Sequence, residues 1–199
     1  SQISHIKKDS FLVNIGDYVK KGTVLATCGN SGRSPEPHIH FQVQHTPVFG
    51  AKTVALPLSY FIENKEGKLE FKINEIPNED TFISNVEELP LLHDSFNFKP
   101  NNRLKITNEK TNVTEIFDIL TNQWNQLYFY CEKSETKLFF KNDGVLFTFE
   151  HFEGDKNSSL FQFYKSCYSI LLGYYPSISL DYYMPNYLFT KFGIQKKNA

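Results

Sequence analysis

The chain has 199 residues, of which 40% are hydrophobic and 22% are charged, and its net charge is -1. This length is enough for one large or two small domains, and the composition excludes a disordered chain because it can build a core. Lysine and arginine residues are spread along the sequence rather than gathered in a basic stripe, which argues against nucleic-acid binding.

The first five residues resemble the middle of a strand, with no initiator methionine and no signal peptide. We therefore expect the 199 residues to be part of a longer chain, in which case the missing signal says nothing about the compartment. The longest apolar run, around residues 170–172, is too short to span a bilayer. The 19 phenylalanines and 11 tyrosines favour strands.

Residues 11–27 predict two short strands joined by turns. The apolar stretches are residues 11–13 and 23–27, and the turns between them carry Gly16 and Gly22. Glycine adopts positive φ at little cost, which suits a tight bend. The density of strands and turns indicates a compact all-β unit.

A loop rich in glycine, proline and serine runs from Gly29 to Pro37 and leads into a strand-like stretch. Side chains alternate along a strand, so we expect His38 and His40 to point the same way. Two neighbouring imidazoles on a strand form half of a zinc site. The alternative is that both are solvent-facing polar residues, since short motifs have many false positives.

Four segments in this part of the chain resemble, in order and spacing, the M23 (LytM/lysostaphin-like) zinc metallopeptidase family. They are residues 4–6 (Ser-His-Ile), residues 13–25, residues 29–32 (Gly-Asn-Ser-Gly) and residues 36–42 (Glu-Pro-His-Ile-His-Phe-Gln). The resemblance covers about the first 45 residues, with a looser similarity to about residue 90. It implies a zinc cofactor and hydrolysis of peptide bonds in peptidoglycan cross-bridges or stems.

The resemblance also implies a role for three histidines. His40 matches the zinc-ligating histidine, and His38 matches the general base toward the zinc-bound water. His5 matches the histidine that orients water or stabilises the tetrahedral intermediate. These roles agree with zinc chemistry. Three protein ligands leave the fourth coordination position of zinc to a water, and zinc lowers the pKa of that water to ~7. A neutral histidine accepts the proton, and a second can donate toward the oxyanion.

One departure from the family pattern concerns the other two zinc ligands. The family takes them from an H-x-x-x-D motif upstream of the position of His5, and this chain starts after that point. Residues 1–199 therefore offer one expected ligand and two assisting histidines. Two interpretations stay open: the missing ligands precede these residues in the full-length protein, or the protein is a degenerate relative.

Other candidate ligands are weaker. His151 and Asp155 have the H-x-x-x-D spacing but lie downstream, where a strand runs into a turn, and we interpret this as coincidence. His45 and His93 have no partners at a recognisable spacing and are expected in surface loops.

The three cysteines are far apart and form no C-x-x-C pair. We expect Cys28, Cys131 and Cys167 to be small buried hydrophobes, although one disulfide of unknown pairing stays open.

The expected fold class is mostly β, in two domains. Residues 1–92 are predicted to be the C-terminal portion of an M23-type antiparallel sheet domain whose N-terminal part is absent. Within it, residues 69–73 and the turn at 66–68 predict an outer hairpin packed on the catalytic sheet, and residues 75–92 an exit linker.

Residues 93–199 predict an accessory α+β domain with one helix. Strands are expected over residues 103–107, 126–131, 137–140, 145–149 and 178–183. A helix is expected over residues 158–173, capped by Asn157 or Ser158 and ended by Gly173. Its many aromatic residues favour core packing over a sugar-binding surface.

Three function classes follow. The first is a zinc metalloendopeptidase acting on peptidoglycan, located in the periplasm or outside the cell, with a peripheral association with the cell envelope as a further option. The second is a degenerate, non-catalytic module that binds cell wall or a protein. The third is a biotinyl- or lipoyl-type carrier, suggested by the turn pattern of residues 13–25, which lacks the required exposed lysine hairpin.

Overall fold

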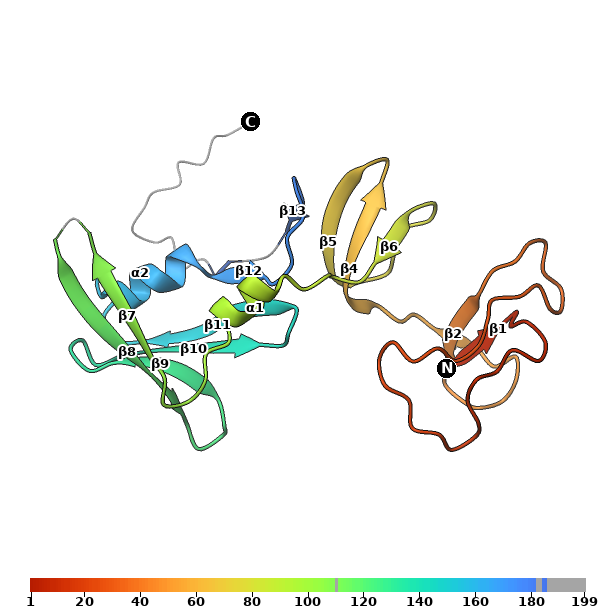
Figure 1. The fold of residues 1–199 in the computed structure, drawn as a ribbon, viewed down its shortest axis with the longest axis horizontal. Coiled ribbons are helices and arrows are strands. Elements are labelled where there is room, and N and C mark those ends of the chain that lie inside the picture. Colours follow the sequence, from red (N-terminus) through yellow and green to blue (C-terminus); the bar gives the residue numbers. More distant parts are fainter. Residues whose placement is uncertain (110, 182–183, 186–199) are drawn as a thin grey trace. The chain divides into compact units, whose positions relative to one another are not determined.

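The computed structural model describes residues 1–109, 111–181 and 184–185. It divides into two compact units, Ser1–Pro57 and Leu58–Ala199, referred to below as unit 1 and unit 2. The fold is mostly β, as expected, with mainly antiparallel sheets (Figure 1). None of the helices in the described residues has the length and apolar character needed to cross a membrane.

Unit 1 contains one small antiparallel sheet surrounded by long irregular loops (Figure 1). Its strands are β1 (Gln2–Ser4), β2 (His40–Gln44) and β3 (Thr53–Val54), in that order across the sheet. The register pairs Gln2 with Gln42 and Ser4 with His40, so these side chains share one face. The opposite face carries Ile3 and Phe41, which are 42% and 51% exposed.

The two strands expected at residues 11–13 and 23–27 are not formed as a ladder. The two segments do run side by side, since the Leu12 N–H donates to the Leu25 carbonyl at 2.9 Å. The turns between them are as predicted, with Gly16 and Gly22 at φ values of 95° and 88°. The side chains of this segment are largely exposed, so little packing holds it in register.

Unit 2 contains two sheets, of which the smaller has four strands. These are β4 (Leu58–Lys65), β5 (Lys68–Glu75), β6 (Phe82–Ser84) and β13 (Ser179–Leu180), in the order β13-β5-β4-β6. The predicted hairpin turn is present, with Glu66 and Gly67 both at positive φ. The strands of the hairpin pair with β6 and β13 in a sheet within unit 2, and the expected packing of the hairpin on the catalytic sheet stays a prediction.

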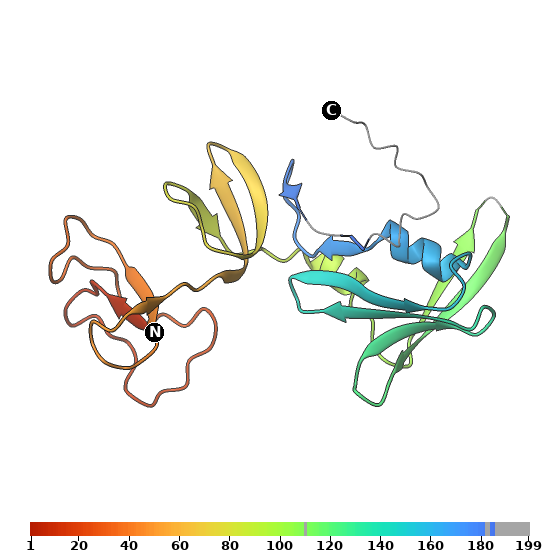
Figure 2. The same cartoon turned by 180° about the vertical axis from the view of Figure 1, so that it is seen from behind.

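The larger sheet of unit 2 has six strands in the order β12-β11-β10-β9-β8-β7. They are β7 (Arg103–Asn108), β8 (Val113–Thr121), β9 (Leu127–Cys131), β10 (Thr136–Asn142), β11 (Leu146–Glu153) and β12 (Ser169–Leu171). Helix α2 (Ser159–Ser166) lies against this sheet (Figure 2). Phenylalanines of the sheet and Leu160, Phe161 and Tyr164 of the helix form the main core, which confirms the packing role predicted for the aromatic residues.

Helix α2 begins as predicted but ends earlier. Ser158 caps it, and its side chain accepts the Phe161 N–H at 3.3 Å. Residues 169–171, expected in the helix, instead form β12 and pair with β11, with Leu146 opposite Leu171. The exposed edge of β11 supplies backbone partners that a helix end lacks, so tertiary pairing overrides helix propensity.

Two further elements differ from the sequence prediction. Helix α1 (Pro90–Ser95) lies in the expected linker and places His93 on a helix rather than in a loop. The long strand β8 is not predicted from sequence. The last predicted strand, over residues 178–183, is present as β13, and residues 182–183 lie outside the described residues.

The expected domain boundary at residues 92 and 93 falls inside unit 2, and the assignment of residues 58–92 to the peptidase region stays a prediction.

Candidate active site

The three histidines singled out in the sequence lie together in unit 1. The ring centroids of His5 and His38 are 4.6 Å apart, and those of His5 and His40 are 6.1 Å apart. His5 therefore contacts both members of the H-x-H pair, although it is more than thirty residues away in sequence. We call His5, His38 and His40 the histidine cluster.

His5 reaches the cluster because its backbone is in the left-handed region, with φ of 63°. In a regular strand the side chain after Ser4 would point to the face opposite His40. The left-handed residue breaks this alternation at the end of β1. Non-glycine residues rarely adopt this conformation, and such strain persists where the surrounding structure holds it in place.

The surrounding structure is the loop of residues 28–32, which is bonded to the backbone of His5 and of the residue that follows it. The Gly29 N–H donates to the His5 carbonyl at 2.9 Å, and the Ser31 hydroxyl donates to the Ile6 carbonyl at 2.8 Å. Gly29 must be glycine, since a Cβ there would stand 2.5 Å from the Lys7 Cα. The glycine-rich loop is therefore structural, as its composition predicts.

The same loop sets the tautomer of His5. Its Nδ1 lies 2.7 Å from the Ser31 carbonyl oxygen. A carbonyl only accepts, so in the neutral ring the proton is on Nδ1 and the lone pair is on Nε2. His5 can then accept a hydrogen bond at Nε2, and it donates from that atom only when the ring carries both protons.

His38 is held in the same way. Its Nδ1 lies 2.8 Å from the Glu36 carbonyl and 3.1 Å from the Ser34 hydroxyl, which itself donates to the Glu36 carbonyl at 2.6 Å. The neutral His38 ring therefore carries its proton on Nδ1 and leaves Nε2 free as an acceptor. A backbone carbonyl on one ring nitrogen is the usual device that orients a functional histidine.

His40 begins β2 and faces Ser4 across the sheet. Strand β2 starts at this residue, so His38 lies in the extended segment before the strand rather than within it. The two histidines nevertheless meet at the same ring of His5, which agrees with the predicted common side.

The described residues do not form a complete zinc site. Across residues 1–109, 111–181 and 184–185, no group of three or more histidine, cysteine, aspartate or glutamate side chains is arranged to hold a metal ion. Zinc sites of hydrolytic enzymes use three protein ligands. The described residues alone do not provide three such ligands in one place.

The remaining candidates are not members of the histidine cluster. His151 is exposed on β11 with its ring 5.8 Å from that of Phe139, and the Asp155 carboxylate accepts the Asn157 N–H at 2.9 Å. His151 and Asp155 belong to no group of three potential ligands among the described residues, and their interpretation as a coincidental spacing stays a prediction. His45 lies in an exposed loop beside β2, as expected.

The cysteines form no disulfide, and all three are free. Cys131 is buried as expected, Cys167 is partly buried, and Cys28 is exposed, contrary to the prediction. Burial raises the pKa of the Cys167 thiol.

Sequence analysis did not find the groups that orient the histidines. They are the carbonyls of Ser31 and Glu36 and the hydroxyl of Ser34. Backbone carbonyls carry no sequence signal, and the loop conformation that aims them is set by contacts distant in sequence. Of these groups, only the Ser34 side chain can be read from the sequence, because its hydroxyl lies four residues before His38 and can reach the ring.

Comparison with known proteins finds similarity in the part of the chain that contains the histidine cluster. Residues 1–53 match the family model "Peptidase family M23". The chain is 32% identical over 74 residues to lysostaphin of Staphylococcus staphylolyticus and, to the same degree, to lysostaphin of Staphylococcus simulans. These matches cover 37% of this chain and only 15% and 14% of the two lysostaphins. No solved structure matches the chain.

The family model ends at residue 53, four residues before the end of unit 1 at Pro57, and all three members of the histidine cluster lie inside the match. Three of the four motifs that suggested the family from sequence, residues 4–6, 29–32 and 36–42, contain these side chains or bond to them. The N-terminal part of this chain, residues 1–53, is a region of peptidase family M23.

Proposed function

We propose that the protein is a zinc metalloendopeptidase that hydrolyses peptide bonds of peptidoglycan, with its catalytic histidines in unit 1. His38 accepts a proton from the attacking water, His5 assists, and His40 is one zinc ligand. The two further ligands would come from an H-x-x-x-D motif outside residues 1–199, since the described residues do not complete a zinc site.

The observation that carries this proposal is the orientation of two histidines of the cluster. Both His5 and His38 have Nδ1 bound to a backbone carbonyl, so both neutral rings present the Nε2 lone pair. A histidine with a free lone pair accepts a proton near neutral pH. The two ring centroids are 4.6 Å apart, so both proton acceptors belong to one site.

The proposed substrate and location follow from the relatives. Lysostaphin and the M23 family support peptidoglycan as the substrate, acted on in the periplasm or outside the cell. A peripheral contact with the cell envelope fits the same proposal. Association with nucleic acid is not proposed, because the chain has no basic stripe.

A second candidate is a degenerate module that binds cell wall or a protein partner without cutting it. The absence of a three-ligand group from the described residues favours this candidate. The two candidates differ in whether the full-length protein holds zinc.

The test uses the natural full-length protein. We expect about one zinc per protein chain by atomic absorption, and cleavage of purified peptidoglycan that stops after chelation. His38→Ala removes the proton acceptor and should lower the cleavage rate at least ~100-fold while leaving the zinc content unchanged. His151→Ala is the matched control, since this exposed histidine has the decoy spacing and should leave both measurements unchanged.

Two results would end the enzyme proposal. One is a full-length protein that neither binds zinc nor releases peptide fragments. The other is cleavage that persists in the His38→Ala protein. Binding to peptidoglycan without zinc or cleavage would support the degenerate module instead.

A further inference from the structure

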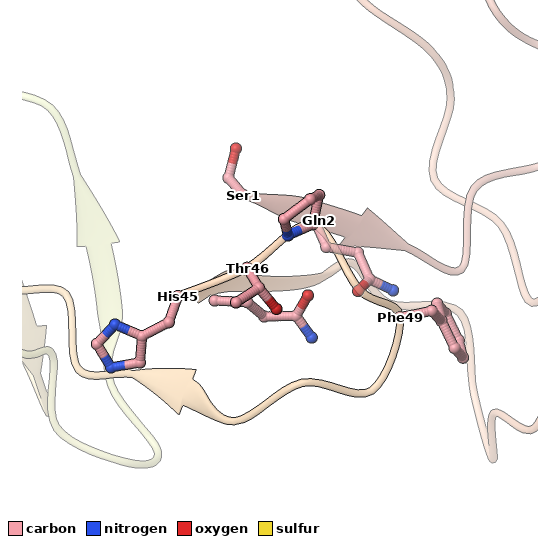
Figure 3. Close-up of a pocket in the computed structure, with 7 residues that line it drawn as sticks. Ser1, Gln2, His45, Thr46 and Phe49 are labelled. Carbon is pink, nitrogen blue, oxygen red and sulfur yellow. The ribbon is translucent and has the colours of Figure 1, made fainter.

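A cavity of about 600 Å³ lies at the far end of β2 from the histidine cluster. Its lining comes from the start of β1 and from the loop that follows β2: Ser1, Gln2, Gln44, His45, Thr46, Pro47 and Phe49. In the view of Figure 3, Gln2 and Thr46 lie between His45 and Phe49. Its volume is in the range of sites that bind small ligands or parts of larger ones.

The loop that forms one wall is fixed by hydrogen bonds. The Gln44 side chain donates to the Ala51 carbonyl at 3.1 Å, and the Ala51 N–H donates to the Val48 carbonyl at 3.1 Å. Gly50 has φ of 77°, which permits the tight turn between these bonds. The turn leaves the Phe49 ring 88% exposed beside the cavity, so an apolar surface is available to a ligand.

A row of amide side chains connects this cavity with the histidine cluster. Gln42 and Gln44 follow His40 at every second position of β2, so all three side chains lie on one face. Gln2 lies on the same face, since the Gln42 amide donates to its side-chain oxygen at 3.2 Å. The row is uncharged, and each amide can both donate and accept a hydrogen bond.

The spacing of the row matches an extended peptide. Strand residues advance about 3.4 Å each, so His40 and Gln44 are roughly 13 Å apart, the length of about four extended residues. A peptide lying along β2 would meet one amide at every second residue. Neutral amides pair with peptide N–H and C=O groups without a requirement for charge.

We propose that the row and the cavity are a substrate-binding lane for an extended, uncharged peptide segment. In the bound peptide, the residue about four positions from the peptide bond that lies at the histidine cluster occupies the cavity and contacts Phe49. This inference rests on the proposed function for the identity of the peptide, which would be a peptidoglycan peptide. The amides recur at every second strand residue, which is the side-chain repeat of an extended peptide, and this match favours a peptide over a glycan strand.

The test is a titration of the isotope-labelled chain followed by NMR. One probe is the sugar-free, cross-linked peptide fraction of peptidoglycan, and the other is the glycan strand freed of peptide. We expect the peptide fraction to shift the side-chain amide signals of Gln2, Gln42 and Gln44 and the ring signals of Phe49. Peptides that end two residues from the peptide bond at the histidine cluster should bind without shifting the ring signals of Phe49.

Two phenylalanine variants give a matched pair. Phe49→Ala should weaken peptide binding about tenfold, the loss of one aromatic contact. Phe11→Ala removes a ring that is 65% exposed and does not line the cavity, so binding should be unchanged. Equal weakening by both variants would overturn the proposal, as would shifts of Phe49 with glycan strands only, or with neither probe.

A cleavage assay with the full-length protein separates this proposal from the proposed function. Peptide binding that needs Phe49, without any cleavage, would support the lane and end the enzyme proposal. Cleavage with the same KM in the parent protein and Phe49→Ala would support the enzyme and overturn the lane.

Discussion

Different interactions stabilise the interior of each of the two units of this chain. Among the described residues, every side chain that is fully buried lies in unit 2, where Phe117, Phe129 and Phe149 belong to one core under α2. Unit 1 has no buried residue, and its candidate site depends on turns and hydrogen bonds. Functional groups often lie on such loops, whereas stability comes from cores. The proposed chemistry therefore resides in the part of the chain with the least burial.

The largest expected difference between the units is the cost of removing a phenylalanine. Phe149 is fully buried, with its ring 5.0 Å from that of Phe147, so Phe149→Ala should lower the free energy of unfolding of unit 2 by ~3–5 kcal/mol. Phe11→Ala in unit 1 should cost less than ~0.5 kcal/mol. Amide hydrogen exchange, read separately for each unit, measures both. Equal costs would contradict the contrast between the units.

A smaller effect is expected at the point where unit 1 is most tightly built. Gly29→Ala places a methyl group against the Lys7 backbone and should destabilise the 28–32 loop by ~1–3 kcal/mol. The ring signals of His5 should move in the NMR spectrum, because this loop holds its Nδ1. Asn30→Ala is the control, since it changes an exposed side chain of the same loop and keeps both Ser31 groups that bond to His5 and Ile6. A Gly29→Ala protein with unmoved His5 signals would show that the loop does not hold the ring.

Unit 2 also contains a buried carboxylate whose loss should be measurable. Glu63 is 4% exposed and accepts the Asn78 N–H at 2.8 Å, the Asn78 side-chain amide at 2.9 Å and the Thr81 hydroxyl at 3.1 Å. These bonds, led by the Asn78 N–H and helped by Lys72, outweigh burial and hold the pKa of Glu63 below its ordinary value of 4.5. Glu63→Gln should cost ~1–2 kcal/mol at neutral pH.

The sign of the pH dependence follows from this lowered pKa. The contribution of Glu63 is complete above about pH 4.5 and is lost as the pH falls through its folded-state pKa. Denaturant unfolding of unit 2 between pH 7 and pH 3 should therefore converge for the parent chain and Glu63→Gln. Glu153→Gln, at an exposed ion pair with Lys137, should change stability by less than ~0.5 kcal/mol. A difference in unfolding free energy between the parent chain and Glu63→Gln that grows toward low pH would contradict this assignment.

The smallest effect is expected at Ser34. Its hydroxyl lies 3.1 Å from His38 Nδ1, but the Glu36 carbonyl is closer and remains in Ser34→Ala. The loss of one hydrogen bond of ~1 kcal/mol corresponds to a cleavage rate lowered less than about fivefold in the full-length protein. A loss as large as that of His38→Ala would mean that the hydroxyl, and not the carbonyl, orients the ring.

Local signals in the sequence were enough for the turns and for much of the strand content. Gly16, Gly22 and Gly67 mark bends by their freedom at positive φ, and Ser158 caps α2 as its position before an apolar run indicates. Pairing partners distant in sequence were not predictable. Residues 169–171 have a helical pattern but become β12 because the edge of β11 is available.

The candidate site was predictable in its members and not in its geometry. The histidines were found through their motifs, and all three fall within the M23 match. The left-handed backbone of His5 and the carbonyls that set its tautomer depend on the 28–32 loop, which folds back over residues 5–7. Contacts of this kind leave no trace in residue order.

The proposed role of the histidine cluster is tested most directly by the tautomeric state of its rings. Nitrogen-15 shifts and long-range couplings of the rings give this state at about pH 8.5, where histidines are neutral. The structure predicts a proton on Nδ1 and a free Nε2 in both His5 and His38. Protons on Nε2 of these two rings, or no through-space contact between them, would contradict the proposed role of the histidine cluster.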